Sequence, residues 1–459
     1  MMSMLPPRPD FPQSGLFLME NTIQSYPWGS KDGLATYAGI ETDPAEPAAE
    51  CWMGSHRLAP SAIYGKNGEK YRLDAFIRHR PALTLGTGLS QKYDELPFLF
   101  KALSAAKPLS IQVHPSEKKA RDGFARENAL GIPQNSPARS YKDPHHKPEL
   151  AVALSSFSAL CGFRHPDEAQ ALMGLAVCSL LNFPAAPRSS DYRPFLQRLL
   201  TLPETQRKNL EELARQRARQ ILGTEKTRED CPEPHGAARQ GRRTAAIQRN
   251  AAHAAARAVL HCYEVYPEDP GAVAPFFLSL FTLAPGQGIY IPAGVLHSYL
   301  DGTILEIMAA SDNVIRGGMT GKKIDVAQLI DIVDTDADPV LIDSNKISAL
   351  CDSFYAKGAA SIRYWPTPAQ EFELALAELR AGGEAGFRLA GPKIFLCSEG
   401  EVTLSCLSPE GEETQESLLV RAGQSVFAPD ACRRLRARGT GKLFCAAVSA
   451  AAVSAEELL

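Results

Sequence analysis

The sequence lacks three features that would each indicate a particular class of protein. None of its ten cysteines forms a C-x-x-C pair, so neither a disulfide framework nor a cysteine-based metal site is indicated. No apolar run reaches the ~18 residues of a membrane span, and the N-terminus lacks the basic-then-apolar pattern of a signal peptide. No glycine-rich phosphate loop is present. We therefore expect a cytoplasmic protein with reduced thiols, no membrane contact, and nitrogen and oxygen ligands for any metal.

A strong charge of either sign is also missing. The 459 residues carry a formal net charge of -3, and acidic and basic residues are interspersed. Surfaces that bind nucleic acid are strongly basic, so nucleic acid is not an expected partner. At roughly 150 residues per domain the chain has room for about three domains. We expect it to act as a monomer.

The pattern of apolar and turn-forming residues changes along the chain and predicts a division into four segments. Residues 1–164 alternate short apolar stretches with Gly and Pro turns, which is typical of strands. Residues 165–262 place apolar side chains at three- and four-residue steps, which predicts a helical insertion with a polar, mobile loop at 224–243. Strand texture returns in 263–330 and in 331–459. The predicted fold class is mainly β, with two β-barrel domains and an α-helical insertion.

The segment Gly286–His297 carries the most informative pattern. Its spacing, G-x5-P-x-G-x2-H, resembles the second half of the cupin signature, and its composition fits a strand, a turn and a second strand. This arrangement would direct His297 into the interior of a small barrel. An imidazole in that place is a candidate metal ligand if other ligands converge on it.

Two other segments supply such ligands. Gln112 and His114 lie two residues apart in a stretch with strand composition, so they share one face of the strand. Glu149 stands at the start of a further apolar strand. A single His, Gln or Glu on a strand is usually a core or solvated residue, but with His297 these residues supply two imidazoles, a carboxylate and an amide oxygen. This set suits Zn²⁺ and also Mn²⁺, Co²⁺ or Fe²⁺.

A weak internal repeat indicates that the strand-turn-strand pattern occurs twice. Ala422–Pro429 aligns with Pro285–Pro292 and matches Gly, Gln and Pro in register. In the same register Arg434 stands opposite His297, and no Q-x-H or H-x-H pair lies upstream in the C-terminal part. The sequence therefore predicts that the second barrel binds no metal and has a mainly structural role.

Several further motifs share their composition and spacing with one known family. They are Ile23–Ser30, Ala49–His56, Leu96–Lys101, Leu109–Pro115, His146–Glu149, Pro292–Tyr299 and Ser311–Thr320. Together they resemble the type I mannose-6-phosphate isomerases over nearly the whole chain. The resemblance implies cupin barrels, one zinc ion per chain bound at Gln112, His114, Glu149 and His297, and a motif arginine at Arg316. It also implies a small-molecule sugar phosphate as substrate and the interconversion of mannose 6-phosphate and fructose 6-phosphate.

An aldose-ketose isomerase moves a proton between C1 and C2, so it needs a base, an electrophile and an anchor for the phosphate. Zinc would supply the electrophile, and Arg316 could stabilise the enediolate oxygens. Glu306 is the favoured base, because its apolar strand would desolvate the carboxylate and raise its pKa. A metal-bound hydroxide is the competing base, and Glu306 could instead orient a ligand. The candidates for substrate binding are Ser110, Lys101, Lys147 and Lys322.

Two other classes of function stay open. An Fe(II) cupin oxygenase would bind oxygen, but the Gln ligand and the missing second histidine of an H-x-H pair argue against it. A non-catalytic sugar-phosphate-binding cupin would lack Arg316 or a ligand, and all are present. The chain departs from the family pattern at His145, at Gly321 and in a long segment between His114 and Glu149, which predicts altered loop shapes.

Overall fold

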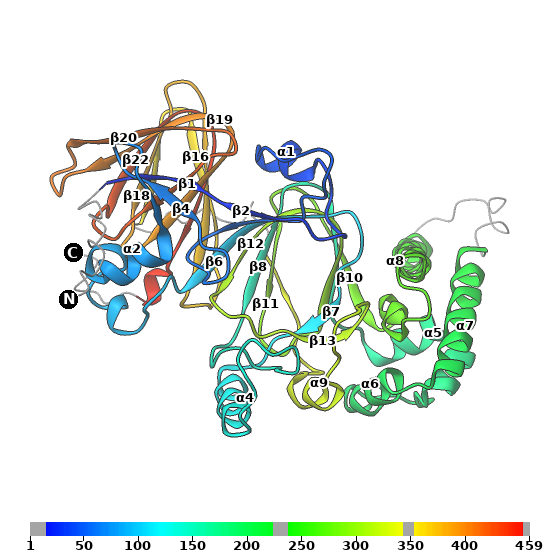
Figure 1. Ribbon diagram of the computed structural model, residues 1–459. Coiled ribbons are helices and arrows are strands. Elements are labelled where there is room, and N and C mark those ends of the chain that lie inside the picture. Colours follow the sequence, from blue (N-terminus) through cyan, green and yellow to red (C-terminus); the bar gives the residue numbers. More distant parts are fainter. Residues whose placement is uncertain (1–14, 224–236, 343–352, 453–459) are drawn as a thin grey trace.

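The computed structural model describes residues 15–223, 237–342 and 353–452, without the side chains of 237–247. These residues form two 11-stranded antiparallel sheets and a group of helices (Figure 1). The predicted fold class, mainly β with a helical insertion, is confirmed. None of the helices in these ranges is long and apolar enough to cross a membrane.

The central sheet holds the predicted ligands. Its strands are β2 (Thr22–Gln24), β3 (Glu50–Met53), β6 (Phe98–Ala105), β7 (Ile111–Val113), β8 (Glu149–Ala153), β9 (Phe157–Phe163), β10 (Leu278–Leu283), β11 (Gly288–Ile291), β12 (His297–Ala309), β13 (Ile315–Gly318) and β14 (Val340–Ile342). Strands β11 and β12 are the predicted strand-turn-strand pair.

Strand β12 belongs to both layers of this sheet. The first part of β12, which begins at His297, pairs with β7 and β9. The second part, from Gly302 onward, pairs with β6. Gly302 permits the bend, since it has φ 107° and a Cβ there would lie 2.4 Å from the carbonyl oxygen of Ser156. The layers are joined through β12, and the strand pairings of the described residues do not close into a ring. The predicted barrel is therefore an open, two-layered sheet.

The second sheet contains strands from both ends of the chain. They are β1 (Phe17–Glu20), β4 (Ala62–Tyr64), β5 (Lys70–Arg72), β15 (Phe354–Lys357), β16 (Ala360–Trp365), β17 (Glu373–Leu379), β18 (Glu384–Arg388), β19 (Lys393–Leu407), β20 (Glu413–Arg421), β21 (Ser425–Ala428) and β22 (Arg434–Ala447). Its pairings also form an open sheet within the described residues.

Strands β1, β4 and β5 correct one part of the predicted domain organisation. The predicted division places residues 1–164 in the first barrel, yet β1 pairs with β21, with Phe17 opposite Phe427. Phe17 is buried there, with its ring centroid 5.4 Å from that of Phe76, so apolar packing draws the N-terminal strand to the C-terminal sheet. With this change, the four-part division remains our proposal.

Helices occupy most of the predicted insertion and lie on the side of the central sheet away from the second sheet (Figure 1). They are α5 (Pro166–Leu181), α6 (Tyr192–Leu200), α7 (Glu204–Gly223) and α8 (Ala237–Val265). Residues 237–243 are helical, so the loop predicted for 224–243 is wrong there, because Ala, Arg and Gln favour a helix even without an apolar stripe. Residues 224–236 lie outside the described ranges.

The remaining helices are short connections around the sheets. They are α1 (Gly33–Ala38), α2 (Leu73–His79), α3 (Pro81–Thr84), α4 (Glu117–Ala129) and α9 (Val326–Ile332).

The two sheets share one apolar core. Leu305 and Ile307 of β12 belong to the same buried cluster as Trp365 and Phe444 of the second sheet. The Trp365 indole N–H donates a hydrogen bond of 3.1 Å to the carbonyl oxygen of Gly286, at the turn before β11. The second sheet therefore supports the turn from which the β11–β12 pair starts.

Candidate active site

Three predicted ligands converge at the ends of neighbouring strands. His114 follows β7, Glu149 begins β8 and His297 begins β12. The Nε2 atoms of His114 and His297 each lie 3.3 Å from an oxygen of Glu149, on Oε1 and Oε2 respectively. All three side chains are at most 2% exposed. Among the described residues they are the group of His, Cys, Asp and Glu side chains whose ligand atoms are close enough to hold a metal ion.

Both imidazoles direct a free ring nitrogen to this centre. The Nδ1 atom of His114 lies 2.6 Å from the carbonyl oxygen of Asn313, and that of His297 lies 3.0 Å from the carbonyl oxygen of Val295. A carbonyl only accepts hydrogen bonds, so Nδ1 carries the proton and Nε2 keeps a lone pair. These two Nε2 atoms and Oε2 of Glu149 are buried without a hydrogen-bond partner. Such atoms are costly unless something binds them, and a divalent metal fits this donor set.

Electrostatics keep these candidate ligands in the protonation states that bind metals. Burial, assisted by the Lys147 ammonium, lowers the pKa of His114 to about 4, although Glu149 opposes the shift. The imidazole is therefore neutral near pH 7. Burial alone would raise the pKa of Glu149, but Lys147 and His114 hold it well below its usual value. Lys147 Nζ donates a hydrogen bond of 2.6 Å to Oε1 of Glu149.

Gln112, the fourth predicted ligand, lies next to this group. In the strand ladders it stands opposite His297 of β12 on one side and Arg316 of β13 on the other. Its side chain lines the same cavity as Glu149. Gln112 is therefore adjacent, through the strand ladder and through the cavity, to the group of His114, Glu149 and His297.

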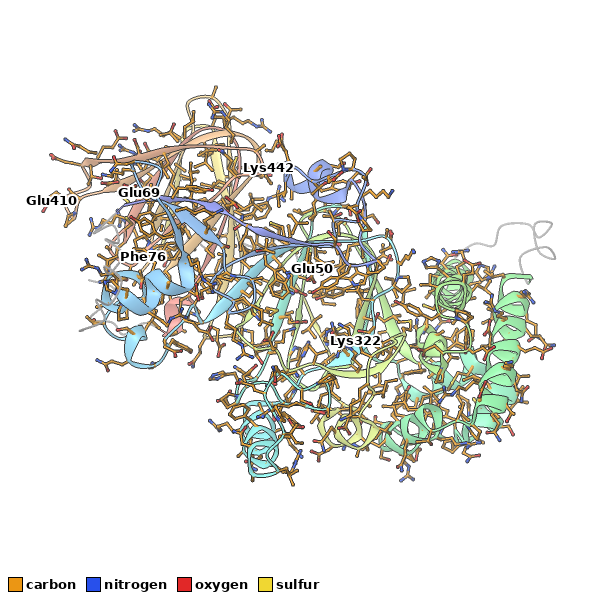
Figure 2. The ribbon with its side chains drawn as sticks, viewed as in Figure 1. Glu50, Glu69, Phe76, Lys322, Glu410 and Lys442 are labelled. Carbon is orange, nitrogen blue, oxygen red and sulfur yellow. The ribbon has the colours of Figure 1, made fainter. Side chains whose placement is uncertain are left out.

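A cavity of about 1040 Å³ adjoins the centre. Figure 2 shows two of its lining residues, Glu50 and Lys322, in the part of the molecule built on the central sheet. The predicted site residues that line it are Lys101, Ser110, Gln112, Lys147, Glu149, Glu306, Arg316 and Lys322. The structure thus brings the predicted catalytic and substrate-binding residues to one cavity.

A buried ion group forms one wall of the cavity. Lys101 forms an ion pair with Glu306, and its Nζ lies 3.8 Å from Oε1 of Glu50. The Tyr299 hydroxyl donates a hydrogen bond of 2.8 Å to Oε1 of Glu306, and the Trp52 indole donates one of 2.7 Å to Glu50. Burial alone would lower the pKa of Lys101, but the carboxylates, with Glu306 first, raise it. Both oxygens of Glu306 therefore have a partner.

Two of the predicted site residues in the cavity, both cations, have no such partner. The side chains of Arg316 and Lys322 line the cavity, and neither forms a hydrogen bond or ion pair with any residue that the structure describes. Burial lowers the pKa of Arg316, and burial together with the nearby Arg316 charge lowers the pKa of Lys322. Two unpaired positive charges at one cavity favour an anionic ligand such as a phosphate.

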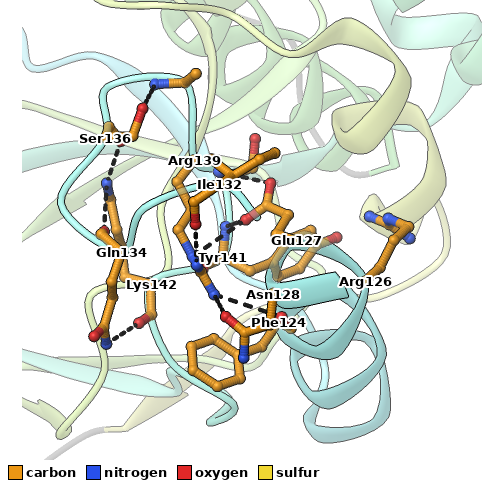
Figure 3. Close-up of polar contacts among 12 residues, drawn as sticks. Phe124, Arg126, Glu127, Asn128, Ile132, Gln134, Ser136, Arg139, Tyr141 and Lys142 are labelled. Atoms are coloured by element: carbon orange, nitrogen blue, oxygen red, sulfur yellow. Dashed lines mark hydrogen bonds and ion pairs between the residues drawn. The ribbon is translucent and has the colours of Figure 1, made fainter. Parts of the chain in front are cut away.

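Sequence reasoning missed the polar network that shapes the cavity rim. The segment between α4 and β8 folds around the buried Arg139 (Figure 3). Arg139 donates hydrogen bonds of 2.6 Å to the carbonyl oxygens of Tyr141 and Ile132, and Glu127 accepts one of 2.9 Å from the Tyr141 amide. Arg139 and Lys142 both line the cavity. Arg139 also donates a hydrogen bond to the side-chain oxygen of Asn128 and lies 3.6 Å from an oxygen of Glu127. Because most of its partners are backbone groups, only the length of this segment marked it in the sequence.

Asn313 lies in the recognised motif Ser311–Thr320, but the motif did not indicate which groups Asn313 contacts. Its carbonyl oxygen binds His114, while its side-chain oxygen accepts a hydrogen bond of 2.7 Å from the Lys142 amide. Its side-chain nitrogen donates bonds of 2.8 Å to the carbonyl oxygens of Asp143 and His145. Asn313 therefore fixes a candidate metal ligand and the cavity rim together.

Comparison with known proteins agrees with this geometry. Residues 16–166 match the family model described as phosphomannose isomerase type I, catalytic domain. Mannose-6-phosphate isomerase of Salmonella typhimurium is 34% identical over 427 residues, which are 92% of this chain and 97% of that protein. The chain belongs to the type I phosphomannose isomerase family.

Other members of the phosphomannose isomerase family match over most of the chain as well. Mannose-6-phosphate isomerase 1 of Arabidopsis thaliana is 29% identical over 432 residues, 88% of this chain and 89% of that protein. The crystal structure of a zinc-bound mannose 6-phosphate isomerase is similar over 95% of this chain and 100% of that chain, with 30% identity and a TM-score of 0.75. The family resemblance predicted from the motifs is confirmed.

Proposed function

We propose that this phosphomannose isomerase interconverts mannose 6-phosphate and fructose 6-phosphate, as a cytoplasmic monomer with one zinc ion per chain. The proposed zinc ligands are Gln112, His114, Glu149 and His297. The observation that carries the proposal is the set of buried, unpaired ligand atoms beside a cavity that also receives two unpaired cations. Zinc bound there would act as a Lewis acid that polarises the sugar carbonyl.

The cations of the cavity divide into paired and unpaired groups, and this supports a division of their roles. Lys101 is paired with Glu306, and Lys147 with Glu149, so both would mainly set the charge around the reacting carbons. Lys322, together with the Ser110 side chain, would hold the phosphate. Arg316 would stabilise negative charge on the enediolate oxygens through its planar fork of donors.

Glu306 is proposed to move the proton between C1 and C2. It lines the cavity, and its partners Lys101 and Tyr299 fix the orientation of its carboxylate. The substitution Glu306→Gln should lower kcat by about 10²–10⁴ and stop exchange of the C2 proton with solvent. If exchange persists in this variant, Glu306 only orients Lys101 and another group is the base.

The proposed reaction can be tested with a coupled assay of fructose 6-phosphate formation from mannose 6-phosphate. The assay compares metal-replete protein, chelator-stripped protein, and stripped protein with zinc restored. Activity should disappear on stripping and return with zinc. A metal-replete protein that binds sugar phosphate without turnover would support the non-catalytic binding protein instead.

A further inference from the structure

Two cysteines of the second sheet lie unusually close together. The sulfur atoms of Cys406 and Cys432 are 2.6 Å apart, and the residues are 26 positions apart in the chain. Cys406 is near the end of β19, opposite Leu435 of β22, and Cys432 lies in the turn between β21 and β22. A disulfide bond is about 2.05 Å long. The two sulfurs, one on β19 and one in the turn before β22, therefore lie close to bonding distance.

The other cysteines that the structure describes differ from this pair. None of them contacts a second sulfur atom among the described residues, and burial raises the thiol pKa of each: Cys51, Cys161, Cys178, Cys262, Cys397 and Cys445. A buried thiol with a raised pKa and no sulfur neighbour is chemically inert. The pKa of Cys406 is raised too, by its contact with Cys432 and by burial, so the pair is distinguished by the short distance between its sulfur atoms and by the lowered pKa of Cys432.

A buried lysine lies close to the pair. Lys393 begins β19, is fully buried, and donates a hydrogen bond of 2.9 Å to the carbonyl oxygen of Leu389. The Cys406 thiol donates a hydrogen bond to the sulfur of Cys432, and this bond, with the Lys393 charge, lowers the pKa of Cys432 although burial opposes the shift. Cys432 is therefore the more readily ionised sulfur, and Cys406 is placed as its resolving partner.

We propose that Cys406 and Cys432 form a reversible redox site, which closes to a disulfide when a peroxide oxidises it. The Cys432 thiolate attacks one oxygen of hydrogen peroxide, so the O–O bond breaks, a sulfenic acid forms and hydroxide leaves. The sulfur of Cys406 then attacks the sulfur of Cys432, the S–O bond breaks, and the released hydroxyl group leaves as water with the Cys406 proton. In total the dithiol loses two electrons and two protons, and one peroxide becomes two waters.

The disulfide between Cys406 and Cys432 would cross-link two parts of the second sheet. The bond would link β19 to the turn before β22 and enclose β20 and β21 in a covalent loop. Such a loop restricts the unfolded chain, so the oxidised protein should unfold at a higher temperature than the reduced protein. The residues of the candidate metal centre and its cavity belong to the central sheet and to the loops and helix ends around it, and none lies on a strand of the second sheet, so isomerase activity should be retained.

Peptide mapping of the full-length, zinc-loaded protein tests the proposal directly. Reduced protein is exposed to equimolar hydrogen peroxide, its remaining thiols are alkylated after denaturation, and it is digested without reductant. The expected product is a cross-linked peptide that contains Cys406 and Cys432, two hydrogen atoms lighter than the separate peptides, which disappears after reduction. Complete alkylation of both cysteines, or a cross-link to a different cysteine, would overturn the proposal.

Matched variants locate the chemistry within the pair. Cys445→Ser changes another buried cysteine of the same sheet and should leave the cross-link and the rise in unfolding temperature intact. Cys432→Ser should remove both. In Cys406→Ser the intermediate cannot be resolved, so a sulfenic-acid probe should label Cys432 and not Cys445. Labelling of Cys445 to the same extent would contradict the assignment of Cys432 as the reacting sulfur.

Discussion

The strand pairs β11–β12 and β21–β22 have the same backbone geometry, and we call them the two copies. They differ in the side chains at the positions of the candidate metal ligands. β11 begins at Gly288 and β12 at His297, while β21 begins at Ser425 and β22 at Arg434, in the same relative register. The turn before each pair starts at a glycine with nearly the same φ, 86° at Gly286 and 82° at Gly423.

Smaller features of the two copies also agree. The side-chain oxygens of Gln287 and Gln424 each accept a hydrogen bond from the backbone amide three residues earlier, at 2.8 and 2.9 Å. The long second strand bends at Gly302 in one copy and at Gly439 in the other, both with positive φ. At each bend a Cβ would lie within 2.4 Å of a backbone carbonyl oxygen of the neighbouring strand or turn, so only glycine fits.

The copies differ where the first one presents the candidate metal ligands. Arg434 takes the place of His297, and the neighbouring strand changes in the same sense. Glu149 of β8 stands opposite Ile291, whereas Lys393 of β19 stands opposite Ala428, which has the same position in the second copy. An imidazole and a carboxylate are thus replaced by two cations, which do not bind a metal ion. The two copies share their backbone geometry, and the side chains at the His297/Arg434 and Glu149/Lys393 positions determine whether a metal ion can bind.

The largest expected effect is a difference in zinc binding between substitutions at the equivalent positions of the two copies. His297→Gln removes an imidazole ligand and should weaken zinc binding by at least about 100-fold, with loss of isomerase activity. Arg434→Gln, at the same register of the second copy, should leave zinc content and activity unchanged. Metal analysis after gel filtration measures both proteins. Equal loss of zinc from the two variants would show that the copies do not differ as described.

The next effect tests whether Arg316, on strand β13 beside the ligand group of the first copy, acts in the reaction. Arg316→Ala should lower kcat/KM by about 10²–10³, since it removes donors aimed at developing charge. Arg316→Lys keeps the charge but loses the planar fork and should recover only part of the rate. Zinc content should stay normal in both. Full activity of the lysine variant would mean that charge alone suffices at this position.

The smallest effect concerns a buried carboxyl group of the second sheet. Burial raises the pKa of Glu373 on β17 to about 7, although the Ala450 amide and the Tyr364 hydroxyl oppose the shift. Between pH 4.5 and 7 the folded protein keeps a proton that the unfolded chain has released, so this group makes stability fall as pH rises through that window. The full penalty, about 3 kcal/mol at most, is present above pH 7.

Glu373→Gln removes this titration. The variant should gain stability toward denaturant at pH 8 and gain little at pH 4, with zinc binding unaffected. Glu378→Gln, on the same strand but partly exposed, is the matched control and should show no such pH dependence. An equal gain at both pH values would show that the carboxyl group is not held protonated by burial.

The repeat and the candidate metal ligands could be picked out from the sequence because both depend on local spacing. The turn glycines and the period of two at the end of β7 marked Gln112, His114 and His297 as candidates without knowledge of the fold. The pairing of β1 with β21 could not be predicted, because an apolar strand can pair with any open sheet edge. The equivalence of Lys393 and Glu149 could not be predicted either. Strands β8 and β19 share no sequence motif, and they are equivalent only because β8 pairs with β11 and β19 pairs with β21.

The most direct test of the account is anomalous X-ray diffraction at the zinc edge from crystals of the zinc-loaded protein. We predict one strong peak per chain, bounded by His114, Glu149, His297 and Gln112, and no peak near Lys393 and Arg434. A peak in the second sheet, or a zinc ion bound away from the two histidines, would contradict the claim that the two copies differ in their capacity to bind metal.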